Sequence, residues 1–141
     1  MKYLKANIFY PRKYNKISIA RMRVVGKKYE KYLASIEDKY DSGMLSLYKK
    51  TGEFHDFKIT NLYYECVKNK NILDLTLISG DDDIYQLNFR EINGFNVTGF
   101  LSDKEDIILC EIGMSKKIYY ICFHLANECE IQIDFKHFIW W

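Results

Sequence analysis

The stretch ILDLTLISGDDDIYQLNFRE, residues 72 to 91, decides the fold class of this chain. Apolar side chains occupy every second position on both sides of the central SGDDD, at Leu73, Leu75, Leu77, Tyr85, Leu87 and Phe89. A period of two residues is typical of β-strands that bury one face. The segment between the two runs is too short for a crossover helix, so we expect the strands to pair as antiparallel neighbours.

Similar runs continue through most of residues 51–141. The segment CEIQIDFKHFIWW, residues 129–141, alternates most regularly and is predicted to be the last strand. KIYYICFHL, residues 117–125, is apolar on both faces, which favours a central strand. Short groups of turn residues, among them Asn93-Gly94, separate the runs. The pattern predicts an antiparallel β-meander of about six strands.

A long amphipathic helix is predicted before the sheet, over residues 18–40. Apolar residues recur there at steps of three or four, at Met22, Val25, Tyr29, Leu33, Ile36 and Tyr40. Ser18 is expected to cap the helix, Asp41-Ser42-Gly43 to end it, and MLSLYKK, residues 44–50, to add one more turn. Gly26 costs a helix about 1 kcal/mol relative to alanine, which indicates close packing against the sheet.

The expected fold class is therefore α+β, with the long N-terminal helix packed on one face of the antiparallel meander. The other face is expected to be partly open to solvent. The length fits a single domain over residues 1–141, in which residues 1–50 are helical and residues 51–141 form the sheet.

Charge divides the chain into two parts. Residues 1–50 hold 13 Lys and Arg against 4 Asp and Glu, whereas residues 51–141 hold 8 against 15. Either the basic and the acidic part neutralise each other in the fold, or one of them meets a partner of opposite charge.

The sequence predicts a cytoplasmic protein without a membrane segment. The N-terminus lacks the apolar region of a signal peptide, and no run of 18 apolar residues occurs. Four cysteines, Cys66, Cys110, Cys122 and Cys129, share no CxxC spacing. Each lies in an apolar, strand-like run, so they are expected to be reduced and buried.

The adjacent pair His55-Asp56 in GEFHDFKI, residues 52–59, is the first candidate for a site. Neighbours on a strand point to opposite faces, so the two side chains meet only if the backbone turns there. The favoured interpretation is a structural hinge at the start of the sheet. Familiar zinc, serine-hydrolase, dinucleotide and phosphate-loop motifs are absent, and we predict no catalytic residue, no metal site and no cofactor.

The triplet Asp81-Asp82-Asp83 is the second candidate. Calcium sites of the EF-hand type space their carboxylates through a longer loop, so three consecutive aspartates predict a solvated hairpin tip instead. The alternation in the last strand also places Glu130 and Asp134 on its solvent side.

FHDFKI, residues 54–59, after a basic amphipathic helix and before a meander closing on CEIQIDFKHF, resembles a group of small uncharacterised bacterial proteins. Some domains of this kind are similar to immunity proteins of polymorphic or contact-dependent toxin systems. The resemblance implies a non-catalytic protein that binds and neutralises a cognate toxin, and it carries over no functional residue.

An acidic surface would suit a toxin with a basic groove, such as a nuclease. The residues expected to contact this protein partner are Asp81, Asp82, Asp83, Glu130 and Asp134. The alternative function is nucleic-acid binding through the basic N-terminal helix. An exposed edge strand can also pair with a second copy, so the sequence allows a homodimer.

Overall fold

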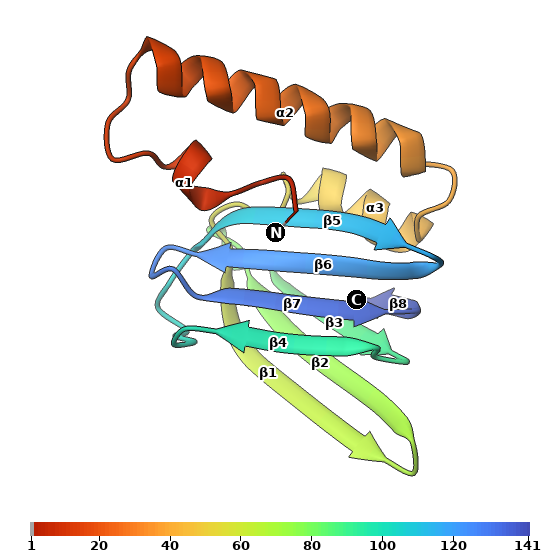
Figure 1. Ribbon diagram of the computed structural model, residues 1–141. Helices are drawn as coiled ribbons and strands as arrows, with labels where there is room; N and C mark the ends of the chain where they lie inside the picture. The colour runs from red at the N-terminus through yellow and green to blue at the C-terminus, as the bar shows by residue number, and fades with distance from the viewer. Residues whose placement is uncertain (1) are drawn as a thin grey trace.

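The structure is a computed structural model and describes residues 2–141 (Figure 1). Within these residues three helices precede eight strands. The helices are α1 (Ala6–Phe9), α2 (Lys16–Ile36) and α3 (Ser42–Lys50). The strands are β1 (Lys58–Val67), β2 (Lys70–Ile78), β3 (Ile84–Arg90), β4 (Gly94–Thr98), β5 (Ile107–Ser115), β6 (Ile118–Leu125), β7 (Glu130–Phe135) and β8 (His137–Trp140). The predicted α+β class is confirmed, with more strands than the six expected.

The strands form two antiparallel sheets rather than one meander. One sheet has the order β1-β2-β3-β8 and the other the order β4-β7-β6-β5. The chain changes sheet twice over very short connections, between β3 and β4 and at Lys136 between β7 and β8. The segment 129–141, predicted as one strand, is therefore split between the two sheets. Short connectors did not guarantee paired neighbours, because a strand can also continue into the facing sheet.

The inner faces of the two sheets bury each other and form the core. Phe89 of β3 and Phe135 of β7 have ring centroids 5.0 Å apart, and both side chains are fully buried. At the β1 and β4 edges, Tyr64 stacks on Phe95 at 5.5 Å. The expectation that the long helix covers one sheet face is wrong, because each sheet already covers the other.

The helices close one side of this sandwich (Figure 1). Helix α3 buries Met44, Leu47 and Tyr48 in the same core cluster as the strands, and it contacts β8. Helix α2 lies along the outside, beside strand β5. Tyr29 and Ile36 of its predicted apolar stripe are buried, whereas Met22, Val25 and Leu33 are half-buried.

Four tyrosine hydroxyls pair with the free edge of β5. Tyr10 donates to the carbonyl of Ile108 at 3.0 Å, and Tyr48 to that of Cys110 at 2.8 Å. The Tyr29 hydroxyl accepts from the N–H of Ile112 at 2.8 Å and donates to its carbonyl at 3.1 Å. The Tyr32 hydroxyl likewise accepts from the N–H of Met114 at 2.9 Å and donates to its carbonyl at 3.2 Å. Burial raises the pKa of Tyr29 and of Tyr48 far above the usual value, so both keep their protons. An edge that would otherwise be open is thereby sealed by side chains.

The local signals of helix α2 differ in part from the sequence prediction. Asn15 is the N-cap; its side chain accepts from the N–H of Ser18 at 2.9 Å, while the Ser18 hydroxyl accepts from the N–H of Asn15 at 2.8 Å. Ser18, the predicted cap, is thus the third helical residue of a capping box. The helix ends at Ile36, and Asp41 caps the start of α3 instead of ending α2.

Gly26 does not mark close packing against the sheet, contrary to the prediction. A Cβ atom built on it would meet no atom within 4 Å, so the space beside this glycine is open.

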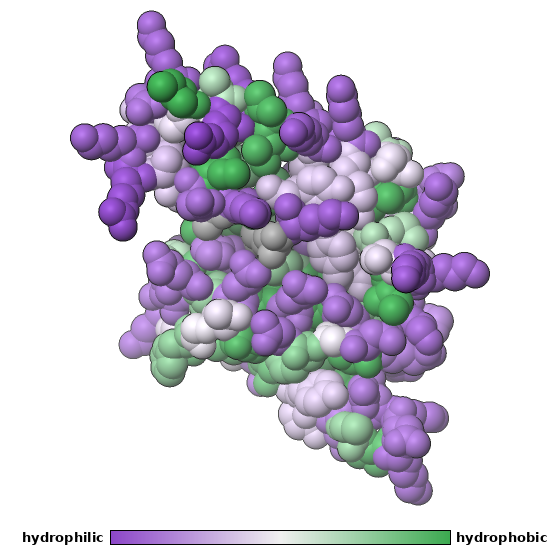
Figure 2. All heavy atoms as spheres, viewed as in Figure 1, coloured by the Kyte–Doolittle hydropathy of each residue, from purple (hydrophilic) through white to green (hydrophobic). Residues whose placement is uncertain are grey.

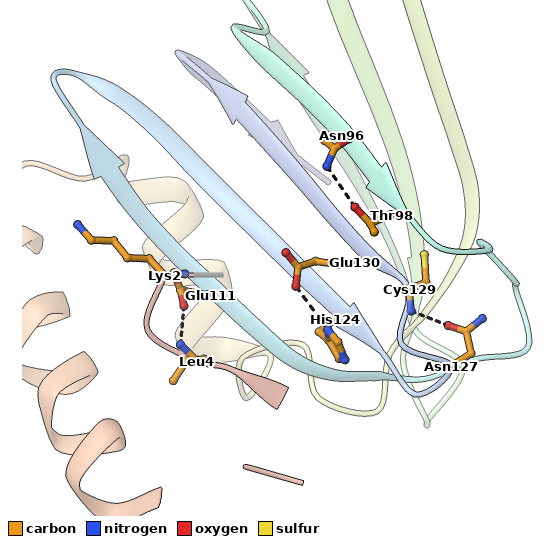
Figure 3. Close-up of polar contacts among 9 residues, drawn as sticks. All are labelled: Lys2, Leu4, Asn96, Thr98, Glu111, His124, Asn127, Cys129 and Glu130. Atoms are coloured by element: carbon orange, nitrogen blue, oxygen red, sulfur yellow. Dashed lines mark hydrogen bonds and ion pairs between the residues drawn. The ribbon is translucent and has the colours of Figure 1, made fainter. Parts of the chain in front are cut away.

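The segment before α1 is held by a buried glutamate of β5. Glu111 is completely buried and accepts from the backbone N–H groups of Lys2, Tyr3 and Leu4 at 2.8, 2.7 and 2.6 Å. Figure 3 draws Glu111 with Lys2 and Leu4. The Tyr120 hydroxyl donates to the same carboxylate at 2.9 Å. The ring of Tyr120 crosses Gly113 to reach it, where a Cβ atom would overlap the ring.

Cys110, Cys122 and Cys129 are buried and free, as expected, but Cys66 is exposed near the end of β1. Strand β1 is the edge strand of its sheet, and most of its side chains are exposed. None of the helices within residues 2–141 combines the length and the apolar composition needed to span a bilayer.

Candidate functional site

Four connections meet at one end of the sandwich and carry nine of the 15 acidic residues in residues 51–141. They are residues 51–57, 79–83, 99–106 and 126–129. The strand register brings these connections together. Ile107 pairs with Leu125, and Lys58 lies opposite Ile78. Lys58 also forms a β-bridge to Asp106. These connections hold nine acidic residues against one lysine. We name this surface the acidic end.

Asp81, Asp82 and Asp83 form the part of the acidic end that the sequence predicted. All three side chains are exposed. Ser79 orders the turn, because its hydroxyl accepts from the N–H groups of Asp81 and Asp83 at 3.2 and 3.1 Å. The triplet is a hairpin tip, as expected.

Glu130 and Asp134 lie elsewhere, on the outer face of the second sheet. Both are half-buried, as the predicted alternation of β7 requires. A Glu130 oxygen lies 3.5 Å from Nδ1 of His124 on the neighbouring strand (Figure 3), and an Asp134 oxygen accepts from the side chain of Gln132 at 3.0 Å. The structure therefore does not bring the five predicted contact residues together.

The sequence prediction did not count the other acidic residues of this end as partner contacts, although it had singled out Asp56 beside His55. They are Glu53, Asp56, Asp103, Glu105, Asp106 and Glu128. Residues 102–106, SDKED, form an acidic run that the sequence displays plainly. Its neighbourhood with Asp81–Asp83 depends on strand register, which no local pattern reveals.

Most of the basic residues of segment 1–50 lie in its first 31 residues. Residues 2–31 contain ten Lys and Arg and a single acidic residue, Glu30. The Lys and Arg side chains of α2 are exposed and project into solvent (Figure 2). Among the described residues, no ion pair within 4 Å joins a cation of this segment to a carboxylate. Direct neutralisation of the basic part by the acidic part is therefore not observed.

His55 and Asp56 do meet, contrary to what their positions on a strand would allow. They lie in a turn before β1, and Asp56 has a positive φ of 64°, as do Glu53 and Phe54 at 63° and 58°. The Nδ1 atom of His55 is 2.9 Å from Oδ1 of Asp56, and its Nε2 atom is 3.2 Å from the Tyr10 hydroxyl. The turn thus builds a chain of polar contacts from Asp56 through His55 to Tyr10.

A cavity of about 510 Å³ adjoins these polar contacts, between the middle of α2 and the start of β5. Its polar lining comes from Tyr10, Tyr14, Tyr29, Glu30, Glu53 and His55, and its apolar lining includes Phe9 and Met22. The volume lies within the range of small-molecule sites. We name this space the α2 cavity.

Two groups of the α2 cavity have perturbed acidities. Partial burial raises the pKa of Glu53, an otherwise exposed residue, above its usual range; a hydrogen bond from Tyr48 and the charge of His55 oppose this, and the negative charge of Glu30 adds to it. Burial also raises the pKa of Tyr10, with contributions from Tyr14 and Asp56. Perturbed acids in a concave space are typical of functional sites, although ion-pair networks also produce them.

We expect Glu53→Gln to stabilise the protein at neutral pH. A carboxyl whose folded-state pKa is raised contributes stability below its unfolded pKa and loses it as the pH rises through the folded value. The variant should therefore resist urea better than the wild type at pH 7, while the two should unfold alike below about pH 4. Urea unfolding at both values measures this, with Glu65→Gln on exposed β1 as the control. A less stable variant at pH 7 would show that Glu53 is structural.

A second cavity of about 870 Å³ lies at the opposite end of the sandwich. Its charged lining is of both signs, and Glu91 there lies 3.0 Å from His137 and 3.2 Å from Lys136. Within residues 2–141, no group of three or more His, Cys, Asp and Glu side chains is placed to hold a metal ion.

Comparisons of the chain with models of protein families, with curated proteins and with solved structures found no match. The surfaces of the molecule itself are therefore what support a function.

Proposed function

We propose that this chain is a non-catalytic binding protein, an immunity protein that neutralises a cognate bacterial toxin by direct binding. The observation that carries the proposal is the acidic end, where four connections present nine acidic residues at one end of the two-sheet sandwich. A surface of one sign speeds the encounter with a partner of opposite sign and disfavours other partners. A toxin whose active site is a basic groove, as in many nucleases, fits this surface.

The experiment is co-expression with a toxin encoded beside the gene, followed by size-exclusion chromatography and binding kinetics. We expect a stoichiometric complex in which the toxin is inactive. Replacing Asp81, Asp82 and Asp83 by asparagine should slow association roughly tenfold or more at low salt and flatten its salt dependence.

A matched control replaces three exposed acidic residues away from the acidic end, Glu37 and Asp38 after α2 and Glu65 of β1, by their amides. It changes the net charge equally and should leave association within about twofold of the wild type. A third variant, with Glu130 and Asp134 neutralised, tests the outer face of the second sheet. If the control slows association as much as the triple variant, the acidic end is not the contact surface.

Nucleic-acid binding is the second candidate function, favoured by the exposed cations of α2. Binding to duplex DNA should then weaken with salt, with a log–log slope near −0.9 for each phosphate contacted. Neutralising Arg23, Lys27 and Lys31 should remove about three phosphate contacts and so reduce the magnitude of that slope by about 2.7. A slope near zero for the wild type would remove this candidate.

A further inference from the structure

We propose that the α2 cavity binds a small organic cation, an amidinium, guanidinium or primary ammonium group carried on an apolar body. The cation would lie between the carboxylates of Glu30 and Glu53, with its apolar body against the tyrosines of the lining. This site shares Glu53 with the acidic end, but it takes a small molecule and does not depend on the proposed toxin partner.

The charge of the lining carries the first step. Glu30 is the one acidic residue among residues 2–31, and it lines the cavity. Glu53 faces the same space and is close enough for the two negative charges to interact. Among the described residues that line the cavity there is no Lys or Arg, although the segment above it is rich in both. The carboxylates of Glu30 and Glu53 therefore have no lysine or arginine beside them in the lining, and a cationic ligand can take that place.

The histidine of the lining offsets this charge only in part. A charge on His55 lowers the pKa of Glu53, but the His55 ring also lies 2.9 Å from the carboxylate of Asp56, so its charge is shared. The Lys and Arg side chains of α2 project into solvent, and ions screen them over a distance of about 8 Å at physiological salt.

Aromatic side chains carry the second step. Phe9, Tyr10, Tyr14 and Tyr29 all contribute to the lining. Aromatic faces attract organic cations, more strongly at the buried Tyr29 than at the solvent-exposed Tyr10 and Tyr14. The remaining lining is mostly apolar, which suits the body of such a ligand and disfavours a hydrated metal ion.

Gly26 carries the third step. A glycine in the middle of a helix destabilises the helix relative to alanine. Packing does not explain this cost, because a Cβ atom at Gly26 would meet nothing within 4 Å. Gly26 lines the cavity, so the absence of a side chain there keeps the space open.

The test uses benzamidine, a cation with an apolar ring, and benzamide, its neutral analogue of nearly the same shape. We expect calorimetry at pH 7 to give a dissociation constant of roughly a millimolar or tighter for benzamidine, and binding at least about tenfold weaker for benzamide. Glu30→Gln and Glu53→Gln should each raise the dissociation constant of benzamidine about tenfold. Equal binding of the two probes, or no binding of benzamidine at about 20 mM, would overturn the proposal.

Further variants distinguish binding in the α2 cavity from binding elsewhere on the molecule. Gly26→Leu fills the space and should abolish binding, whereas Gly26→Ala should bind benzamidine and unfold at a higher urea concentration than the wild type. Glu37→Gln, also an exposed glutamate, should bind as the wild type does. If Asp81, Asp82 and Asp83 changed to asparagine abolishes benzamidine binding while Glu30→Gln does not, the cation binds the acidic end and the cavity site is wrong.

Discussion

Glu111→Gln is expected to lower the free energy of unfolding by about 3 kcal/mol, although it changes no volume. The two carboxylate oxygens accept from three backbone N–H groups and one hydroxyl, and all four are donors. An amide nitrogen in place of either oxygen would face two of these donors with hydrogens of its own. The residue is fully buried, so water cannot take over the lost contacts.

Chemical unfolding of Glu111→Gln and the wild type measures the loss, and hydrogen exchange locates it. The amides of Lys2, Tyr3 and Leu4 should exchange faster in the variant, because they donate directly to this carboxylate. Glu65→Gln, on an exposed strand, should change the free energy of unfolding by less than about 0.5 kcal/mol. Unchanged exchange at residues 2–4 would show that the segment is held by other contacts.

Tyr29→Phe is expected to cost about 2 to 3 kcal/mol. The loss of one hydroxyl leaves both the N–H and the carbonyl of Ile112 without their partner, inside a site that buries Tyr29 to 4% exposure. A phenyl ring keeps the packing, so the loss reports the hydrogen bonds alone. The same change at Tyr32 should add to it, because Met114 loses the equivalent pair.

The double variant Tyr29→Phe, Tyr32→Phe should also self-associate. With both hydroxyls removed, the edge of β5 offers free backbone groups to a second chain. Analytical ultracentrifugation over a range of concentrations detects this, with Tyr63→Phe on exposed β1 as the control for losing a tyrosine hydroxyl. A double variant that is as stable as the control would mean that the hydroxyls do not hold this edge.

The strands and the long helix were predictable because their signals are local. The period of two in residues 72–91 predicts β2 and β3, and the apolar run of residues 117–125 predicts the central strand β6. Repeating apolar residues likewise predict α2. Side-chain alternation depends only on backbone geometry, so it survives in any tertiary arrangement.

The candidate sites were predictable only as isolated residues. Asp81–Asp83 stands out in the sequence, but its neighbours at the acidic end come from three other connections. His55 and Asp56 were noticed as a pair, whereas Tyr10 and Glu30 were not, since they reach the same cavity from distant parts of the chain. The pair meets because Asp56 has a left-handed backbone conformation, and the sequence has no glycine at this position that would have predicted it.

The sequence by itself determined the α+β class, the period of each main element and the uneven distribution of charge. Only the tertiary structure decided that the strands form two facing sheets, that tyrosines seal β5, and that Glu30 and Glu53 share a cavity. The physical reason is that secondary structure follows from neighbours along the chain. The pairing of sheets and the assembly of a site depend instead on contacts between residues up to about a hundred positions apart, such as Leu4 and Glu111.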